Sequence, residues 1–260
     1  FLSEIFSRFS EDHAVTAPDY GTTPNQISCY TTSLDSTATS GVESRIEARL
    51  RRTTHALGGT MYSGRVVSVR PLEPSDLPVL TQLANDPEVR QLVVGWDWPV
   101  SAHGQPAWLE STRSAPHTHP LAVVNRESGE TIGLTGLWDL DWHNRSAMSA
   151  IKLDVSRSPR GAGFDVVMLV HAWAFYEVGL HRLWGAILDF NAASYHLYVR
   201  KCGGRLEGIE TQSVQRAGGW SDLYRVAMLR SDFDAHPNAD EYRSIICPVD
   251  TTPFEKPETT

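Results

Sequence analysis

The stretch SPRGAGFDVVM, residues 158–168, places Gly161 and Gly163 between a run typical of a β-strand and a run typical of a helix. Glycine tolerates positive φ angles and lets a ligand approach the backbone closely. The free N–H groups of a first helical turn, together with the helix dipole, favour an anion there. The pattern therefore predicts a phosphate-binding turn, although a glycine turn that only caps a helix has the same spacing.

Asp165 follows close to the position where that phosphate would bind. A carboxylate in the first turn stabilises the helix through its dipole, but it repels a nearby phosphate. Either Asp165 points away from the glycine turn, or the anion site is altered and binds its usual ligand weakly. We favour the first alternative.

The elements that must position this turn are read from hydrophobic periodicity and turn residues. Their order, with strands and helices alternating, predicts an α/β domain with a mixed sheet. The expected strands are residues 65–72, 120–125, 131–142, 147–155, 181–188, 205–215 and 221–230, and the expected helices are 73–86, 105–114, 164–179 and 192–202.

Composition narrows the class of protein. The chain has 260 residues and is 41% hydrophobic, which is enough for a core, and no apolar run approaches the roughly 20 residues that span a membrane. The net charge of −8 argues against a general nucleic-acid surface. Cys29, Cys202 and Cys247 have no metal-binding or disulfide spacing, so we expect no metal and a reducing, cytoplasmic location.

Three segments are expected along the chain. Residues 1–60 are rich in Ser, Thr, Pro and Gly and are expected to form a largely flexible extension with one short helix. Residues 61–233 carry the regular pattern of the domain. Residues 234–260 are expected to be a C-terminal tail, in which YRSIICPV could dock as an edge strand.

Over roughly residues 65–233 the sequence resembles the GNAT superfamily of acyl-CoA N-acyltransferases, and within it the RimJ/RimL-like branch. The resemblance depends on six pieces that occur in the family's order: VRPLEPSD, TIGLTGLWDLDWHNRSAMSAIKL, RGAGF, GLHRLWGAILDFNAASYHLY, KCGGRLEG and GGWSDLYRVAMLR. It implies a single domain with a central mixed, mostly antiparallel sheet and helices on both faces. It also implies acetyl-CoA as cosubstrate.

The resemblance assigns a coenzyme A site. In the family the glycine turn holds the pyrophosphate, the end of the preceding strand contacts the thioester and pantetheine through its backbone, and an N-x-x-S motif lies near the pantetheine arm. The run after Gly163 departs from the family, because FDVVM replaces a polar pair. The residues carried over are Leu153, Val155, Ser158, Arg160, Gly161, Ala162, Gly163, Phe164, Asn191 and Ser194.

The resemblance also suggests catalytic residues. Tyr198 matches the tyrosine that often protonates the leaving thiolate, although a packed aromatic residue would fit its helix equally well. A general base must take the amine proton. Asp139 and Asp189 are the candidates, with Asp141 and His143 as further alternatives, and a chain of water molecules could replace them.

Trp96, Asp97 and Trp98 lie where the family's acceptor loop falls, and Trp138 is on a strand facing that region. Aromatic faces and a carboxylate could hold a cationic amine, although core packing explains the same residues. The expected acceptor is a primary amine of a small metabolite, such as an antibiotic or its precursor, or a protein N-terminus.

Two alternatives stay open. The altered FDVVM run could reflect a different donor, such as an acyl carrier protein or an aminoacyl-tRNA, and only the latter would make nucleic acid a partner. Loss of the base could instead leave a non-catalytic GNAT-like binding module. No membrane partner is expected, and a homodimer is compatible with the sequence.

Overall fold

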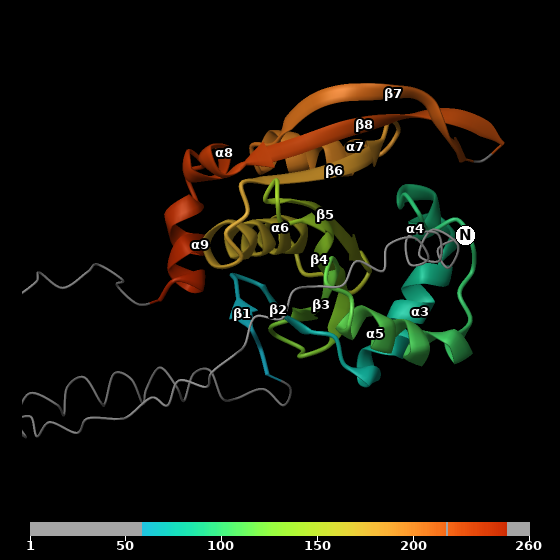
Figure 1. Cartoon of the computed structure of the whole chain (residues 1–260). Helices are drawn as coiled ribbons and strands as arrows, with labels where there is room; N and C mark the ends of the chain where they lie inside the picture. The colour runs from blue at the N-terminus through green and yellow to red at the C-terminus, as the bar shows by residue number, and fades with distance from the viewer. Residues whose placement is uncertain (1–58, 217, 249–260) are drawn as a thin grey trace, which may run out of the picture. The chain divides into compact units, whose positions relative to one another are not determined.

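The computed structural model describes residues 59–216 and 218–248. In this part of the chain an eight-stranded sheet has the order β1-β2-β3-β4-β5-β6-β8-β7 (Figure 1). Neighbouring strands are antiparallel except for β5 and β6, which are parallel. The predicted mixed, mostly antiparallel sheet is therefore confirmed. The strands are β1 Tyr62–Ser63, β2 Val67–Pro71, β3 His119–Asn125, β4 Thr131–Asp141, β5 Ser146–Leu153, β6 Arg182–Leu188, β7 Arg205–Arg216 and β8 Gly219–Leu229.

Helices cover both faces of the sheet, as predicted. Before β3 the helical segments are η1 Pro74–Asp76, α3 Leu77–Asn85, α4 Pro87–Leu92, η2 Ala102–Gly104 and α5 Gln105–Arg113. After β5 they are α6 Ala162–Ala172, the π-helical turn η3 Trp173–Glu177, α7 Ala192–Tyr195, the π-helical turn η4 His196–Lys201, α8 Arg230–Asp234 and α9 Ala239–Ile246. No helix in the described ranges has the length and apolar character that crossing a bilayer requires.

Alternation along the strands separates two apolar clusters. Leu121 and Val123 of β3 face the larger cluster, which includes most of α6, whereas Ala122 faces the smaller cluster under α3 and α5. Successive side chains of a strand point to opposite faces, so β3 and β4 each contribute to both clusters. The face of the sheet on which a side chain lies thus follows from its position in the strand.

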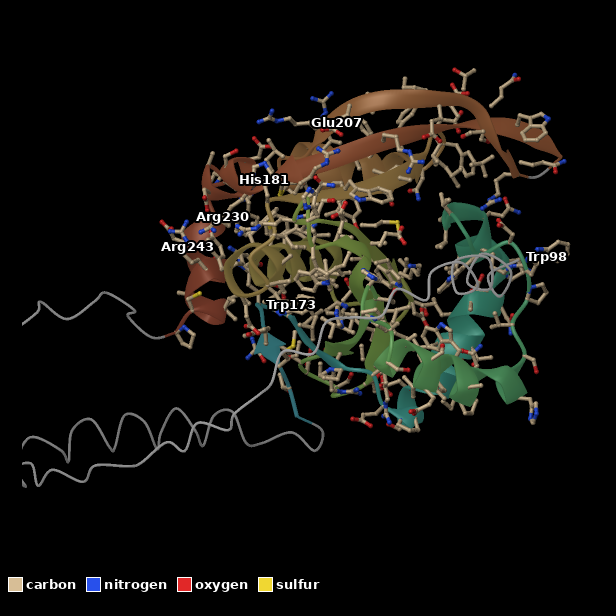
Figure 2. All side chains as sticks on the ribbon, in the orientation of Figure 1. Trp98, Trp173, His181, Glu207, Arg230 and Arg243 are labelled. Atoms are coloured by element: carbon tan, nitrogen blue, oxygen red, sulfur yellow. The ribbon has the colours of Figure 1, made fainter. Side chains whose placement is uncertain are left out.

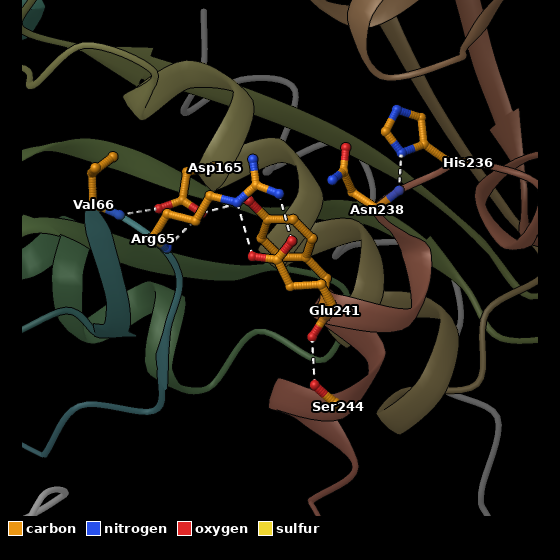
Figure 3. Close-up of polar contacts among 8 residues, drawn as sticks. Arg65, Val66, Asp165, His236, Asn238, Glu241 and Ser244 are labelled. Atoms are coloured by element: carbon orange, nitrogen blue, oxygen red, sulfur yellow. Dashed lines mark hydrogen bonds and ion pairs between the residues drawn. The ribbon is translucent and has the colours of Figure 1, made fainter.

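Asp165 points away from the glycine turn. Its carboxylate accepts hydrogen bonds from the backbone N–H groups of Arg65 (2.9 Å), Val66 (2.7 Å) and Val67 (3.0 Å), at the start of β2. It also accepts one from the hydroxyl of Tyr242 in α9 (2.7 Å). Figure 3 shows Asp165 directed at the segment that contains Arg65 and Val66, beside the ion pair between Arg65 and Glu241. The Asp165 carboxylate, 1% exposed, therefore ties α6 to β2 and α9.

Gly64 makes this contact possible. A Cβ atom at this position would lie 2.3 Å from Oδ1 of Asp165, which is closer than atoms can approach. The turn between β1 and β2 consequently needs glycine so that three consecutive N–H groups can converge on one carboxylate.

The C-terminal segment differs from one expectation. Residues 239–246 form helix α9, so the edge strand considered for YRSIICPV is wrong. Tyr242 and Ile246 are buried in the larger cluster, because an amphipathic helix lets both face α6. The boundaries 1–60, 61–233 and 234–260 stay predictions, and residues 1–58 lie outside the described part.

We predict that Asp165→Ala lowers the free energy of unfolding by about 3–5 kcal/mol, because it leaves several buried donors without an acceptor. Urea denaturation measures the change. Asp240→Ala is the matched control, because its carboxylate lies on α9, the helix of Tyr242, but is 91% exposed, so its loss should change stability by under about 0.5 kcal/mol. Equal stability of the two variants would contradict this role of Asp165.

Candidate functional site

A cavity of about 210 Å³ opens where β5 and β6 diverge. The two parallel strands pair only from Ser146 to Met148 with Arg182 to Trp184. Beyond that point the backbone N–H and C=O groups of β5 that face β6, and those of β6 that face β5, no longer pair with each other. Such unpaired backbone groups can bind a ligand. The cavity is lined by residues 148–152 of β5, 183–187 of β6, part of β8, residues 92–94 and side chains from α6, α7 and η4.

Tyr198 supplies an unpaired hydroxyl to this cavity. It belongs to η4, and its buried oxygen has no hydrogen-bond partner among the described residues. Burial raises the pKa of Tyr198, so the phenol keeps its proton throughout the neutral range. Irregular π-helical turns often occur at functional sites. The arrangement presents a neutral proton donor to a ligand.

His171 of α6 lines the same cavity, with its ring centroid 6.3 Å from that of Tyr198. Burial lowers the pKa of His171 to about 3, so the ring is neutral. Its Nδ1 lies 3.3 Å from the sulfur of Met228, and its Nε2 has no partner in the described ranges. No periodic pattern in the sequence indicates that His171 lines a cavity, because it lies within an otherwise apolar helix.

Asn191 and Ser194 line the cavity, as their predicted role requires. Asn191 caps α7 by accepting from the Ser194 N–H (3.1 Å), and its amide donates to Leu92 O (3.3 Å). These bonds fix the helix start against residues 92–94 and hold Ser194 at the wall.

The glycine turn at the start of α6 is open. Gly161 has φ 90°, and a Cβ there would meet no atom within 4 Å. The Ala162 N–H donates to Pro159 O, but the N–H groups of Gly163 and Phe164 have no acceptor among the described residues. These features are typical of a helix N-terminus that binds an anion.

The turn is held and oriented by its neighbours. The Ser158 hydroxyl donates to Asp154 O (2.7 Å), whereas Arg160 is exposed beside the turn. Gly163 packs closely on the cavity wall, because a Cβ there would lie 3.2 Å from Leu197 and 3.8 Å from Ile151. The turn and the cavity are therefore adjacent.

Leu153 and Val155 do not line the cavity. Strand β5 ends at Leu153, which packs on the larger cluster, and Val155 lies in the following turn with 84% exposure. The wall is formed instead by residues 148–152, slightly earlier in the strand. The expected strand extended too far, because the apolar pattern continues through Val155.

Asp139 and Asp189 also lie outside the cavity. Asp139 is exposed in an irregular part of β4, with φ 50°. The Asp189 carboxylate accepts from the N–H groups of Phe190 (2.9 Å) and Asp222 (3.3 Å), so it fixes the loop after β6. Asp141 similarly accepts from Asn144 (2.8 Å), which lowers the pKa of its carboxyl.

The predicted acceptor residues separate into two groups. Trp96 and Trp138 both lie close to Lys152, whose Nζ is 5.4 Å and 4.4 Å from their ring centroids. Asp97 instead pairs with Arg216 (3.0 Å). Trp98 is 72% exposed, and Figure 2 shows it at the edge of the molecule.

Lys152 was missed by sequence reasoning, although it is the one charged residue in the run AMSAIKL. It lines the cavity, as does Arg225 of β8, which pairs with Glu210 (2.6 Å). No cluster of three metal-ligating side chains occurs within residues 59–216 and 218–248.

Comparisons with known proteins agree with this geometry. Residues 67–205, just over half of the chain, match the acetyltransferase (GNAT) domain family. The probable N-acetyltransferase YjcK of Bacillus subtilis (strain 168) is 32% identical over 180 residues, which span 66% of this chain and 98% of that protein.

Two solved structures share the fold. Spermidine N-acetyltransferase from Vibrio cholerae, in complex with CoA and spermine, has a TM-score of 0.59 at 21% identity and covers 64% of this chain and 96% of its own. A GCN5-related N-acetyltransferase from Brucella melitensis has a TM-score of 0.57 at 21% identity, with 72% and 85% covered. With the family match over residues 67–205, the chain belongs to the GNAT family of N-acetyltransferases.

Proposed function

We propose that this enzyme transfers acetyl from acetyl-CoA to a primary amine, in the manner of the RimJ/RimL-like branch. The acceptor is a small metabolite or a protein N-terminus. One observation carries the proposal: the cavity between β5 and β6 contains the unpaired hydroxyl of Tyr198 and adjoins the open glycine turn of α6.

The residues present fit coenzyme A. The N–H groups of Gly161, Gly163 and Phe164, with Arg160 beside them, would hold the pyrophosphate. The β5 backbone around Ile151, with Asn191 and Ser194, would hold the pantetheine arm. When bound, acetyl-CoA supplies an acetyl group activated as a thioester.

The chain's own residues would take part in the transfer of protons. Tyr198 carries a proton at its hydroxyl oxygen inside the cavity and would give it to the leaving thiolate. No carboxylate is among the described residues that line the cavity. We therefore assign removal of the acceptor's proton to water, with Asp139 and Asp189 as the alternatives.

The sequence feature that suggested an acyl carrier protein or an aminoacyl-tRNA as donor has another explanation. This feature is the FDVVM run, and Asp165 of that run is engaged by β2 and Tyr242 rather than by the glycine turn. The valines of the same run are buried in the core. A cytoplasmic location and a homodimer stay predictions of the sequence.

We predict that Gly161→Glu removes acetyl-CoA binding, because a carboxylate would occupy the open turn and repel the pyrophosphate. Acetyl-CoA at about one hundred times its Kd should stabilise the wild-type protein by about 2.7 kcal/mol and this variant hardly at all. Thermal unfolding with and without acetyl-CoA measures the difference.

Gly179→Glu is the matched control for that experiment. Gly179 also has a positive φ (79°) and open space around its Cβ, so the backbone strain is similar. It should keep the full stabilisation by acetyl-CoA. Equal stabilisation of the Gly161 variant would show that the turn is not used.

We predict that Tyr198→Phe lowers kcat by about 100-fold and leaves acetyl-CoA affinity nearly unchanged, because only the proton donor is lost. Steady-state kinetics and calorimetric titration measure the two effects. Tyr195→Phe, on the same helical segment but away from the cavity, is the control. Wild-type kcat in Tyr198→Phe would reassign this residue to packing.

A further inference from the structure

Lys152 lies on the acceptor side of the sheet. Its strand neighbours Ile151 and Leu153 pack on the larger cluster with α6, and alternation directs Lys152 to the opposite face. There it is cross-strand from Leu134 of the smaller cluster and contacts two tryptophan rings. Coenzyme A would bind from the α6 side, so Lys152 does not face the pyrophosphate turn.

The ammonium group is held in place without a counter-ion. Its Nζ lies 4.4 Å from the ring centroid of Trp138 and 5.4 Å from that of Trp96. No carboxylate of the described residues lies within 4.0 Å of it. Burial lowers the pKa of Lys152 to about 8, so most of it is protonated at neutral pH. A desolvated cation of this kind gains from an anionic ligand.

The remaining charges at the cavity do not compensate Lys152. Arg225, the other charged residue among the described lining residues, is already paired with Glu210. Asp97, the nearby acid that could attract a cationic acceptor, is paired with Arg216 (3.0 Å). The unpaired charge on this wall is therefore positive. A polyamine would add like charges to it, whereas a carboxylate would neutralise it.

We propose that Lys152, fixed by Trp96 and Trp138, binds a carboxylate of the acceptor, so that the preferred acceptor is a primary amine that also carries a carboxylate. The inference depends on the proposed acetyl transfer. It separates this protein from the structural neighbour whose complex contains spermine. The single ammonium group of Lys152 matches one carboxylate in charge, and the two tryptophan rings restrict the position of the ammonium group.

The test uses pairs of acceptors that share the reacting amine and differ in whether the rest of the molecule carries a carboxylate. An α-amino acid is compared with its amide, and β-alanine, γ-aminobutyrate and ε-aminocaproate are compared with diamines of equal length and with spermidine. In the wild-type protein we expect kcat/KM to favour at least one carboxylate-bearing acceptor over its partner by about tenfold or more. Lys152→Met should abolish this preference, and Lys152→Arg should retain it.

Lys201→Met is the matched control, because it removes the same charge from an exposed site outside the cavity. It should keep the wild-type preference. Lys152→Met keeps the unbranched side chain and removes a half-buried charge, so it should fold and bind acetyl-CoA normally, which thermal unfolding with acetyl-CoA checks.

Two readouts distinguish failure of this inference from failure of the proposed function. Absence of acetyl-CoA binding by the wild-type protein would reject the function itself. With acetyl-CoA bound, tryptophan fluorescence is titrated with the same acceptors, so that binding is measured even where turnover is absent. Preference for diamines or spermidine, no preference within any pair in either readout, or an unchanged preference in Lys152→Met would overturn the role of Lys152.

Discussion

The site depends on one constraint, the short pairing of the only parallel strand pair in the described sheet. Strands β5 and β6 pair along three positions and then diverge, so the sheet opens instead of closing over its own backbone groups. Both strands stay anchored on their outer edges, β5 by β4 and β6 by β8. The opening is therefore a stable part of the fold, and it places β5 backbone, Tyr198 and Lys152 around one cavity.

A second interaction protects the anion site beside this opening. Asp165 would be harmful in a phosphate-binding turn if its charge faced the ligand. Its carboxylate instead accepts hydrogen bonds from three backbone N–H groups and the hydroxyl of Tyr242, and it points away from the glycine turn. The Asp165 carboxylate consequently does not compete at the free N–H groups of the first turn, and this departure from the family's pattern has a structural explanation.

Local spacing predicted the glycine turn, whereas Asn191, Ser194 and Tyr198 were predicted from the resemblance to the family, and their roles stay proposals. The glycine turn, Asn191, Ser194 and Tyr198 lie within short segments whose periodicity fixes their element, and the structure brings the last three into one cavity. Positions that depend on tertiary structure were predicted less well. Where β5 leaves β6 cannot be read from an apolar run, so the sequence did not indicate that residues 148–152 line the cavity, and the roles of Leu153 and Val155 stay predictions. Trp96, Trp138 and Lys152 come from three separate segments of the chain, and no local sequence pattern indicates that they meet.

The most direct test of the central claim is a crystal structure of the protein with coenzyme A. We expect electron density for the pyrophosphate at the N–H groups of Gly161, Gly163 and Phe164. We also expect the pantetheine arm between β5 and β6, with its sulfur near the hydroxyl of Tyr198. Coenzyme A bound elsewhere, with the opening between β5 and β6 unoccupied, would contradict the account.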